Sequence, residues 1–233
     1  MQSEQVSERI AENWQQTQRR VVEAAESAGR DPSSIHVIGV TKYVDAATAR
    51  PLVDAGCKEL GENRPQMLWK KAEELSDCEG IQWHVIGHLQ TNKLRRTLKL
   101  QPLIHSVDSE RLLRAIDDEA AKQQFVAEVL LEINISGDES KTGLMPDSLR
   151  ELLRPEYENV RIRGLMAMAG LGTSAAEAGN QFEQVRVLRD RIQDESGTPL
   201  AELSMGMTAD FPEAIAAGAT MVRIGSALFD GVR

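Results

Sequence analysis

Eight short runs of apolar and β-branched residues recur along the chain, and stretches with helical periodicity separate them. The runs lie at 35–40, 57–61, 81–87, 102–107, 127–135, 160–168, 200–206 and 221–229. Several of them, such as residues 37–40, are apolar at successive positions, which is typical of parallel strands that helices cover on the outside. The alternation predicts an α/β fold, a closed (β/α)8 TIM barrel, with an open doubly wound sheet as the structural alternative.

The stretches between the runs predict helices that complete this pattern. They lie at 45–55, 65–75, 91–99, 109–123, 146–153, 178–194 and 211–217. A further amphipathic helix is expected within residues 1–30, before the first strand. The 233 residues suit one barrel, so we predict a single domain over 1–233. The small residues of segment 164–179 predict a flexible loop after the sixth strand.

Charge and cysteine content restrict the partners and the compartment. The formal net charge of -9 disfavours nucleic acid and anionic membranes and favours a small-molecule ligand. The chain has no apolar run near the roughly 20 residues that span a bilayer, and its first residues do not resemble a signal peptide. Cys57 and Cys78 offer neither metal-ligand spacing nor a disulfide framework. These features predict a cytoplasmic protein that is neither membrane-bound nor secreted.

Lys42 is the strongest single candidate for chemistry. In a parallel barrel the functional residues gather where the strands end, and Lys42 ends the first apolar run. Desolvation at such a position would lower the pKa of its amine toward the nucleophilic form. The other reading is a solvated lysine at a strand end. The remaining lysines have helical neighbours, begin a strand or lie in the polar loop around Lys141.

The ends of the last two runs predict a phosphate site. Ser204-Met205-Gly206 ends the seventh run and Gly225-Ser226 lies in the eighth, close to the expected ends of the strands, which is where this fold habitually binds phosphate through backbone N–H groups and hydroxyls. Arg223 lies within the eighth run. Its guanidinium could donate to a pyridine-type ring nitrogen, or it could form a structural ion pair with a barrel carboxylate.

Other polar residues at the strand ends are weaker candidates. Glu62, Asn63 and Arg64 could bind a ligand or tie loops together. Asn63 is the best candidate for binding a ligand because it lies nearest the end of the strand. His84 and His88 do not have the helical spacing of a zinc pair, so His84 is expected to be a strand histidine with a hydrogen-bond partner and His88 a residue at the barrel mouth. His36 and His105 are likewise expected in strands, and no metal is predicted.

The chain resembles a known family, the pyridoxal phosphate homeostasis proteins, also called the alanine-racemase N-terminal-domain-like or proline-synthase co-transcribed family. The matching stretches run nearly from end to end: VTK at 40–42, GENRPQ at 61–66, WHVIGHLQTNK at 83–93, IHSVD at 104–108, EINISGDESKTG at 132–143, RGLMAM at 163–168, LSMGMTADFPEAI at 203–215 and VRIGSALF at 222–229. The resemblance implies a barrel of the alanine-racemase type that holds pyridoxal 5′-phosphate as a Schiff base on Lys42. It also implies that Ser204, Gly206, Gly225 and Ser226 surround the phosphate and that Arg223 faces the pyridine nitrogen.

The resemblance further implies a mainly non-catalytic, usually monomeric protein that buffers the cofactor or delivers it to apo-enzymes. This chain departs from the family pattern at Tyr43-Val44, at Thr208 and at the FDG of 229–231, which affects contacts at the mouth. Racemases of this type carry a second domain that supplies a catalytic group, whereas this sequence stops soon after the eighth run, so we favour a carrier. The alternatives are an amino-acid racemase or lyase that uses the same cofactor, and a cofactor-free Schiff-base aldolase.

Overall fold

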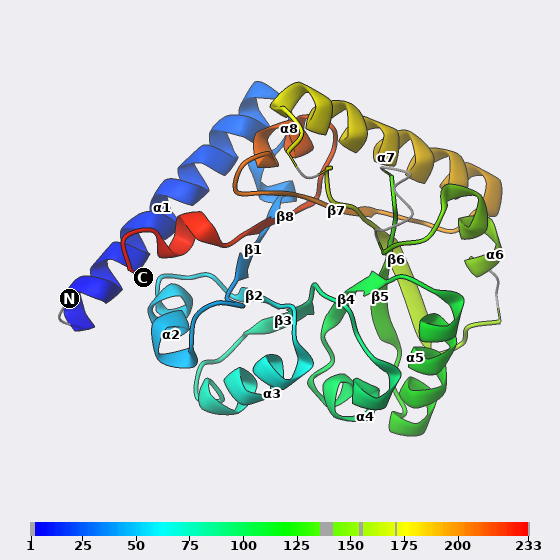
Figure 1. Cartoon of the computed structure of the whole chain (residues 1–233), viewed down its shortest axis with the longest axis horizontal. Coiled ribbons are helices and arrows are strands. Elements are labelled where there is room, and N and C mark those ends of the chain that lie inside the picture. The colour runs from blue at the N-terminus through cyan, green and yellow to red at the C-terminus, as the bar shows by residue number, and fades with distance from the viewer. Residues whose placement is uncertain (1–2, 136–141, 154–155, 171, 233) are drawn as a thin grey trace.

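Eight parallel strands form a closed barrel in which β8 pairs with β1 (Figure 1). The computed structural model describes residues 3–135, 142–153, 156–170 and 172–232. The strands are β1 (His36–Val40), β2 (Glu59–Glu62), β3 (Gln82–Val85), β4 (Leu103–Val107), β5 (Ala127–Glu132), β6 (Val160–Met166), β7 (Glu202–Met207) and β8 (Met221–Ile224). Each strand pairs with the next in chain order, which confirms the predicted barrel and rules out the open sheet.

Helices alternate with the strands and surround the barrel. They are α1 (Ser3–Ser27), α2 (Ala46–Asp54), α3 (Pro65–Glu74), α4 (Leu94–Thr97), α5 (Glu110–Gln123), α6 (Leu149–Leu152), α7 (Ala175–Ser196) and α8 (Phe211–Ala216). Short 3-10 helices are η1 (Pro32–Ser34), η2 (Thr91–Lys93), η3 (Leu98–Leu100), η4 (Pro146–Ser148) and η5 (Ser226–Phe229). Side-chain caps begin three of the helices, because Asp45, Ser109 and Ser174 accept backbone N–H groups of α2, α5 and α7. In the described part of the chain, no helix is long and apolar enough to cross a membrane.

The N-terminal helix α1 packs against α2, α8 and η5. Ile10, Trp14 and Val21 on α1 are buried in this contact. The amide of Asn13 donates to the carbonyls of Leu228 (3.2 Å) and Asp230 (3.0 Å). Through its contact with η5, which follows β8, α1 lies along the outside of the barrel where its first and last strands meet (Figure 1).

Several predicted element boundaries need correction, and three of them affect the site. The eighth strand ends at Ile224 instead of continuing to residue 229, because Gly225 leaves the extended conformation and η5 begins. The fifth strand ends at Glu132 rather than at residue 135. The predicted loop 164–179 is too long at both ends, because β6 continues to Met166 and the Ser174–Glu177 capping box begins α7.

Residues inside the barrel form a cluster that is separate from the core between strands and helices. Its apolar members are Ile38, Leu103, Leu130, Met166 and Met221. Polar side chains from β3, β4, β7 and β8 fill the rest of the interior, and they contact one another. The barrel interior therefore links its two ends through polar groups.

Candidate functional site at the carboxyl ends of the strands

Lys42 lies in the turn that follows β1, where it is half-buried. Its Nζ is 5.1 Å from the centre of the Tyr43 ring, a cation–π contact, and Tyr43 itself is 71 % exposed. Among the residues that the structure describes, no carboxylate lies within ion-pair distance of Lys42. The predicted site lysine is thus accessible and is not neutralised by a neighbouring acid.

A buried ion pair supports the turn that carries Lys42. Lys71 of α3 donates to the carbonyl of Thr41 (2.6 Å) and forms a short contact with the Glu62 carboxylate. The Thr41 hydroxyl donates to the same carboxylate at 2.6 Å. Lys71 and Glu62 are 1 % and 0 % exposed, so this pair is structural. Glu62 therefore ties loops together, and Lys71 is a contributor that the sequence analysis missed.

Three further residues at this end have different surroundings. Asn63 is half-buried against Gly87, where an added Cβ would lie only 2.6 Å from the Asn63 carbonyl oxygen. Arg64 is exposed at the beginning of α3. His88 is exposed, with Nδ1 at 3.2 Å from the carboxylate of Asp108. Of the three, only Asn63 lies partly inside the mouth.

The ends of β7 and β8 lie next to each other, as predicted, because these two strands pair. Gly206 has a φ of +89° and packs so closely on α8 that an added Cβ would lie 2.5 Å from the Cβ of Ala214. Gly225 and the exposed Ser226 begin η5, and the first N–H groups of a helical turn have no acceptor within it. Gly206, Gly225 and Ser226 therefore form a concentration of backbone donors.

Ser204 and Met205, unlike Gly225 and Ser226, are fully buried. Met205 is 0 % exposed and belongs to the core between strands and helices, so its side chain cannot reach the mouth. Ser204 is also fully buried, and its hydroxyl lies inside the barrel at 2.8 Å from His105 and 2.6 Å from Arg223. The expected phosphate contact of the Ser204 hydroxyl is thus replaced by contacts inside the barrel.

Arg223 reaches into the barrel from β8 and is 5 % exposed. Its NH1 donates to the Ser204 carbonyl (2.7 Å) and hydroxyl (2.6 Å), and its NH2 donates to the Ala167 carbonyl (3.0 Å). Burial lowers the pKa of Arg223 to about 10, so the guanidinium stays charged at neutral pH. No carboxylate forms an ion pair with it in the described part of the chain, so the structural ion pair that the sequence left open is not found there.

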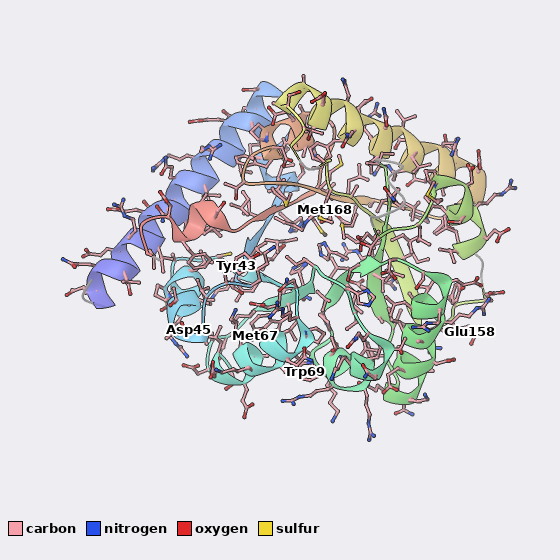
Figure 2. The ribbon with its side chains drawn as sticks, in the orientation of Figure 1. Tyr43, Asp45, Met67, Trp69, Glu158 and Met168 are labelled. Carbon is pink, nitrogen blue, oxygen red and sulfur yellow. The ribbon has the colours of Figure 1, made fainter. Side chains whose placement is uncertain are left out.

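A cavity of about 700 Å³ is lined by residues at and after the carboxyl ends of β5, β6 and β7, and none of the predicted cofactor-binding residues is among them. Met168 and Met207 on its wall are 46 % and 40 % exposed. Tyr43 and Met168 both lie within the ring of barrel elements in Figure 2. Burial raises the pKa of Glu132 on the same wall, while Thr142 donates to its carboxylate at 2.8 Å. The mouth thus offers apolar contact area next to Arg223.

Comparison with known proteins defines first the class and then the family. The family described as alanine racemase, N-terminal domain, matches residues 7–231, in agreement with the barrel and the lysine after β1. A pyridoxal phosphate homeostasis protein of Aquifex aeolicus is 40% identical over 90% of this chain and 92% of its own length, and one of Escherichia coli K12 is 34% identical over 94% and 95%. PipY of Synechococcus elongatus, whose structure was solved with PLP bound, is 36% identical with a TM-score of 0.80 and covers 90% of this chain and 99% of its own. The chain belongs to the pyridoxal phosphate homeostasis protein family.

Proposed function

We propose that this protein binds pyridoxal 5′-phosphate (PLP) at the carboxyl ends of its strands and functions in PLP homeostasis as a buffer or carrier of the cofactor. The observation that carries the proposal is the pair of cations at the mouth, Lys42 and Arg223, for which the described residues supply no ion-paired carboxylate. The fields of Glu132 and Asp210 only partly balance the buried Arg223 guanidinium, and a ligand acceptor would satisfy its remaining N–H groups. PLP offers an aldehyde for the amine, a ring nitrogen for the guanidinium and a phosphate for the backbone donors.

Lys42 is proposed to hold the cofactor covalently. Its Nζ forms a carbon–nitrogen double bond with the aldehyde carbon, and the aldehyde oxygen leaves as water. The half-buried turn position suits this reaction, because water can leave and the amine can be reached. The buried Lys71–Glu62 pair holds the backbone of Thr41 and so restricts the position of the neighbouring Lys42.

Arg223 is proposed to face the pyridine nitrogen. Three of its hydrogen bonds go to Ser204 and Ala167, which fixes the plane of the guanidinium. Of its five N–H groups, the remaining ones are free to donate to a ring nitrogen. A guanidinium is a donor without lone pairs, so it keeps that nitrogen unprotonated. When bound, PLP acts as an electron sink, and an unprotonated ring nitrogen weakens this property.

The phosphate is proposed to bind at Gly206, Gly225 and Ser226. Backbone N–H groups without side chains in the way, together with the Ser226 hydroxyl, suit a dianion. Met205 contributes its backbone only, and we assign Ser204 to the support of Arg223 instead of to the phosphate. Asn63 is proposed to donate its amide to a polar ring substituent.

The absorbance of the purified protein tests this assignment. Wild-type protein mixed with PLP is expected to develop a visible band from the lysine adduct, and Lys42→Ala is expected to lack it. Lys58→Ala is the matched control, because Lys58 is exposed just before β2, at the opposite end of the barrel, and should leave the band unchanged. Borohydride reduction followed by peptide mass spectrometry should find the PLP adduct on Lys42. A colourless wild type would overturn the proposal, and an adduct on another lysine would overturn the assignment of the site.

The carrier role is tested separately. Holo-protein is expected to restore the activity of PLP-dependent apo-enzymes and to leave a panel of L-amino acids unchanged, as a monomer by gel filtration. Turnover of an amino acid that is lost in Lys42→Ala would instead establish a racemase or lyase. We also propose a cytoplasmic location, which the two free cysteines suit.

A further inference from the structure

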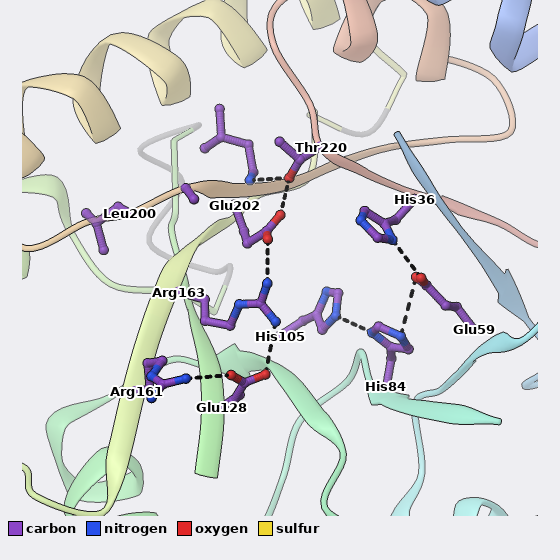
Figure 3. Close-up of polar contacts among 12 residues, drawn as sticks. His36, Glu59, His84, His105, Glu128, Arg161, Arg163, Leu200, Glu202 and Thr220 are labelled. Atoms are coloured by element: carbon purple, nitrogen blue, oxygen red, sulfur yellow. Dashed lines mark hydrogen bonds and ion pairs between the residues drawn. The ribbon is translucent and has the colours of Figure 1, made fainter. Parts of the chain in front are cut away.

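A continuous series of polar contacts crosses the barrel interior from Arg223 to the amino-terminal end of the barrel. Arg223 contacts the Ser204 hydroxyl (2.6 Å), which is 2.8 Å from Nδ1 of His105. Nε2 of His105 is 2.9 Å from Nδ1 of His84, and Nε2 of His84 is 3.7 Å from the Glu59 carboxylate. That carboxylate contacts His36 at 2.7 Å, where the series reaches solvent. Figure 3 shows the part from His105 to His36, and we call the residues from Arg223 to Glu59 the interior relay.

The two inner histidines of the interior relay are neutral, so each carries one ring proton. Burial lowers the pKa of His84 to about 4 and lowers the pKa of His105 well below its usual value. A neutral imidazole has one donor and one acceptor nitrogen, which gives the relay a direction. The hydrogen bonds can be donated from Ser204 toward Glu59 or from His84 toward Ser204, and the groups at the two ends of the relay distinguish these directions.

Both ends favour the same direction. Arg223 can only donate, so the Ser204 hydroxyl accepts from it and has its own proton available for Nδ1 of His105. His105 then carries its proton on Nε2 and donates to Nδ1 of His84, whose proton lies on Nε2 and faces Glu59. In the opposite direction, the lone pair of His84 Nε2 would face a carboxylate oxygen, which is repulsive.

Glu59 is suited to this role because it is an anion. Burial raises its pKa, but the hydrogen bond from His36 and the positive field of His36 and Arg163 outweigh burial and hold the pKa of Glu59 below its usual value. Within the described residues, Glu59 Oε2 and His84 Nε2 are both buried and neither has a hydrogen-bond partner. These two atoms face each other at 3.7 Å.

We propose that Glu59, at the opposite end of the barrel from Lys42, is a positioning residue for Arg223. By fixing His84 and His105 as the Nε2–H tautomers, it leaves Nδ1 of His105 free to accept the Ser204 proton. The Ser204 hydroxyl is thereby fixed with a lone pair toward Arg223 and holds the guanidinium in the orientation that meets the pyridine nitrogen. The tautomers are independent of PLP, whereas the effect on PLP rests on the proposed function above.

Nuclear magnetic resonance of the 15N-labelled protein without PLP tests the first part. Long-range 1H–15N correlations of the imidazole rings should show the Nε2–H tautomer for both His84 and His105 in the wild type. An Nδ1–H tautomer at either residue overturns the proposal, and this measurement needs no variant that could fail to fold. In Glu59→Gln the side-chain amide can present either an oxygen or an N–H to His84, so both tautomers should appear. Glu59→Asp, which keeps the charge, should restore the wild-type pattern.

PLP titration tests the second part. Glu59→Gln is expected to bind PLP about tenfold more weakly than the wild type and to shift the visible band, since the hydrogen bond that orients a charged donor is disturbed. Glu128→Gln is the matched control, because Glu128 is a carboxylate at the same end that contacts Arg161 and Arg163 outside the relay. Equal affinity of Glu59→Gln and wild type would overturn the inference alone, whereas a wild type that binds no PLP would overturn the proposed function.

Discussion

The two ends of the barrel differ in whether they contain cations that form no ion pair. At the amino-terminal end, acids and bases pair with one another, as Figure 3 shows for His36 with Glu59, Arg161 and Arg163 with Glu128, and Arg163 with Glu202. At the carboxyl-terminal end, Lys71 pairs with Glu62 and His88 lies next to Asp108, whereas Lys42 and Arg223 form no ion pair among the described residues. The two cations without an ion pair therefore lie at the end where a phosphorylated aldehyde is proposed to bind.

This difference has an energetic side. An exposed ion pair of the amino-terminal end, such as Arg161–Glu128, contributes about 0–1 kcal/mol, so it can be lost at little cost. A buried cation without an anion is much more unfavourable. The Ser204 end of the interior relay accepts fixed hydrogen bonds from Arg223, and Glu62 supplies the counter-charge of the buried Lys71. Single substitutions of buried charged residues at the carboxyl-terminal end should therefore lower the free energy of unfolding more than substitutions of exposed ion pairs at the amino-terminal end.

The largest expected effect concerns Lys71. Lys71→Met leaves the Glu62 carboxylate buried without its cation and should lower the free energy of unfolding by about 3–5 kcal/mol in urea denaturation. Lys70→Met is the matched control on the same helix, because Lys70 is exposed and contacts Glu74 at 3.7 Å. Its effect should stay below about 1 kcal/mol. Equal losses in the two variants would show that the carboxyl-terminal end is not the sensitive one.

The sequence predicts the barrel well, because each strand and helix leaves a local pattern. The eight runs, Pro65 at the beginning of α3 and the strand-end positions of Lys42, Gly225 and Ser226 all depend on neighbours in the chain. Parallel pairing then brings the ends of β7 and β8 together without further information. The position of most of the proposed site is therefore visible in the sequence.

The interior contacts are not visible in the sequence, because barrel closure creates them. His84, His105 and Ser204 lie on three different strands, and only their common inward orientation makes them neighbours. The sequence analysis predicted a hydrogen-bond partner for His84, which is confirmed, but it could not identify His105 as that partner. Likewise, Lys71 has helical neighbours, and nothing local indicates that its ammonium reaches the Thr41 carbonyl.

Gly206→Ala is expected to have an intermediate effect. The new Cβ would lie 2.5 Å from Ala214 at a φ of +89°, so α8 must move away from β7. Left-handed strain and overpacking together should lower the free energy of unfolding by about 2–4 kcal/mol, and the moved backbone donors should weaken PLP binding. Urea denaturation and PLP titration measure the two effects.

Gly197→Ala separates strain from packing in this prediction. Gly197 ends α7 with a φ of +69°, and an added Cβ would meet no atom within 4 Å. Only the strain of about 1 kcal/mol should remain, with PLP affinity unchanged. If both alanine variants bind PLP as the wild type does, Gly206 is not part of the phosphate site.

The smallest expected effect concerns His36 at the amino-terminal end. The hydrogen bond with Glu59 raises the pKa of His36 above its usual value, although burial opposes it. A raised pKa means that the pair stabilises the fold fully below about pH 6.5, the value for an unfolded histidine, and that this contribution disappears as the pH rises through the raised pKa. Because the His36 side chain is 49% exposed, solvent screening limits the contribution to less than about 1 kcal/mol.

Chemical denaturation of the wild type and His36→Gln across this pH range checks the sign. The wild type should be the more stable protein at pH 5.5 by this small margin, the two should converge above pH 8, and 1 M salt should reduce the difference at low pH. A difference that grew with pH would mean that the pair is held by a neutral hydrogen bond rather than by charge. His36 would then be held by a neutral hydrogen bond, as the histidines of the interior relay are. The two ends of the barrel would in that case differ only in whether a ligand can reach their polar groups.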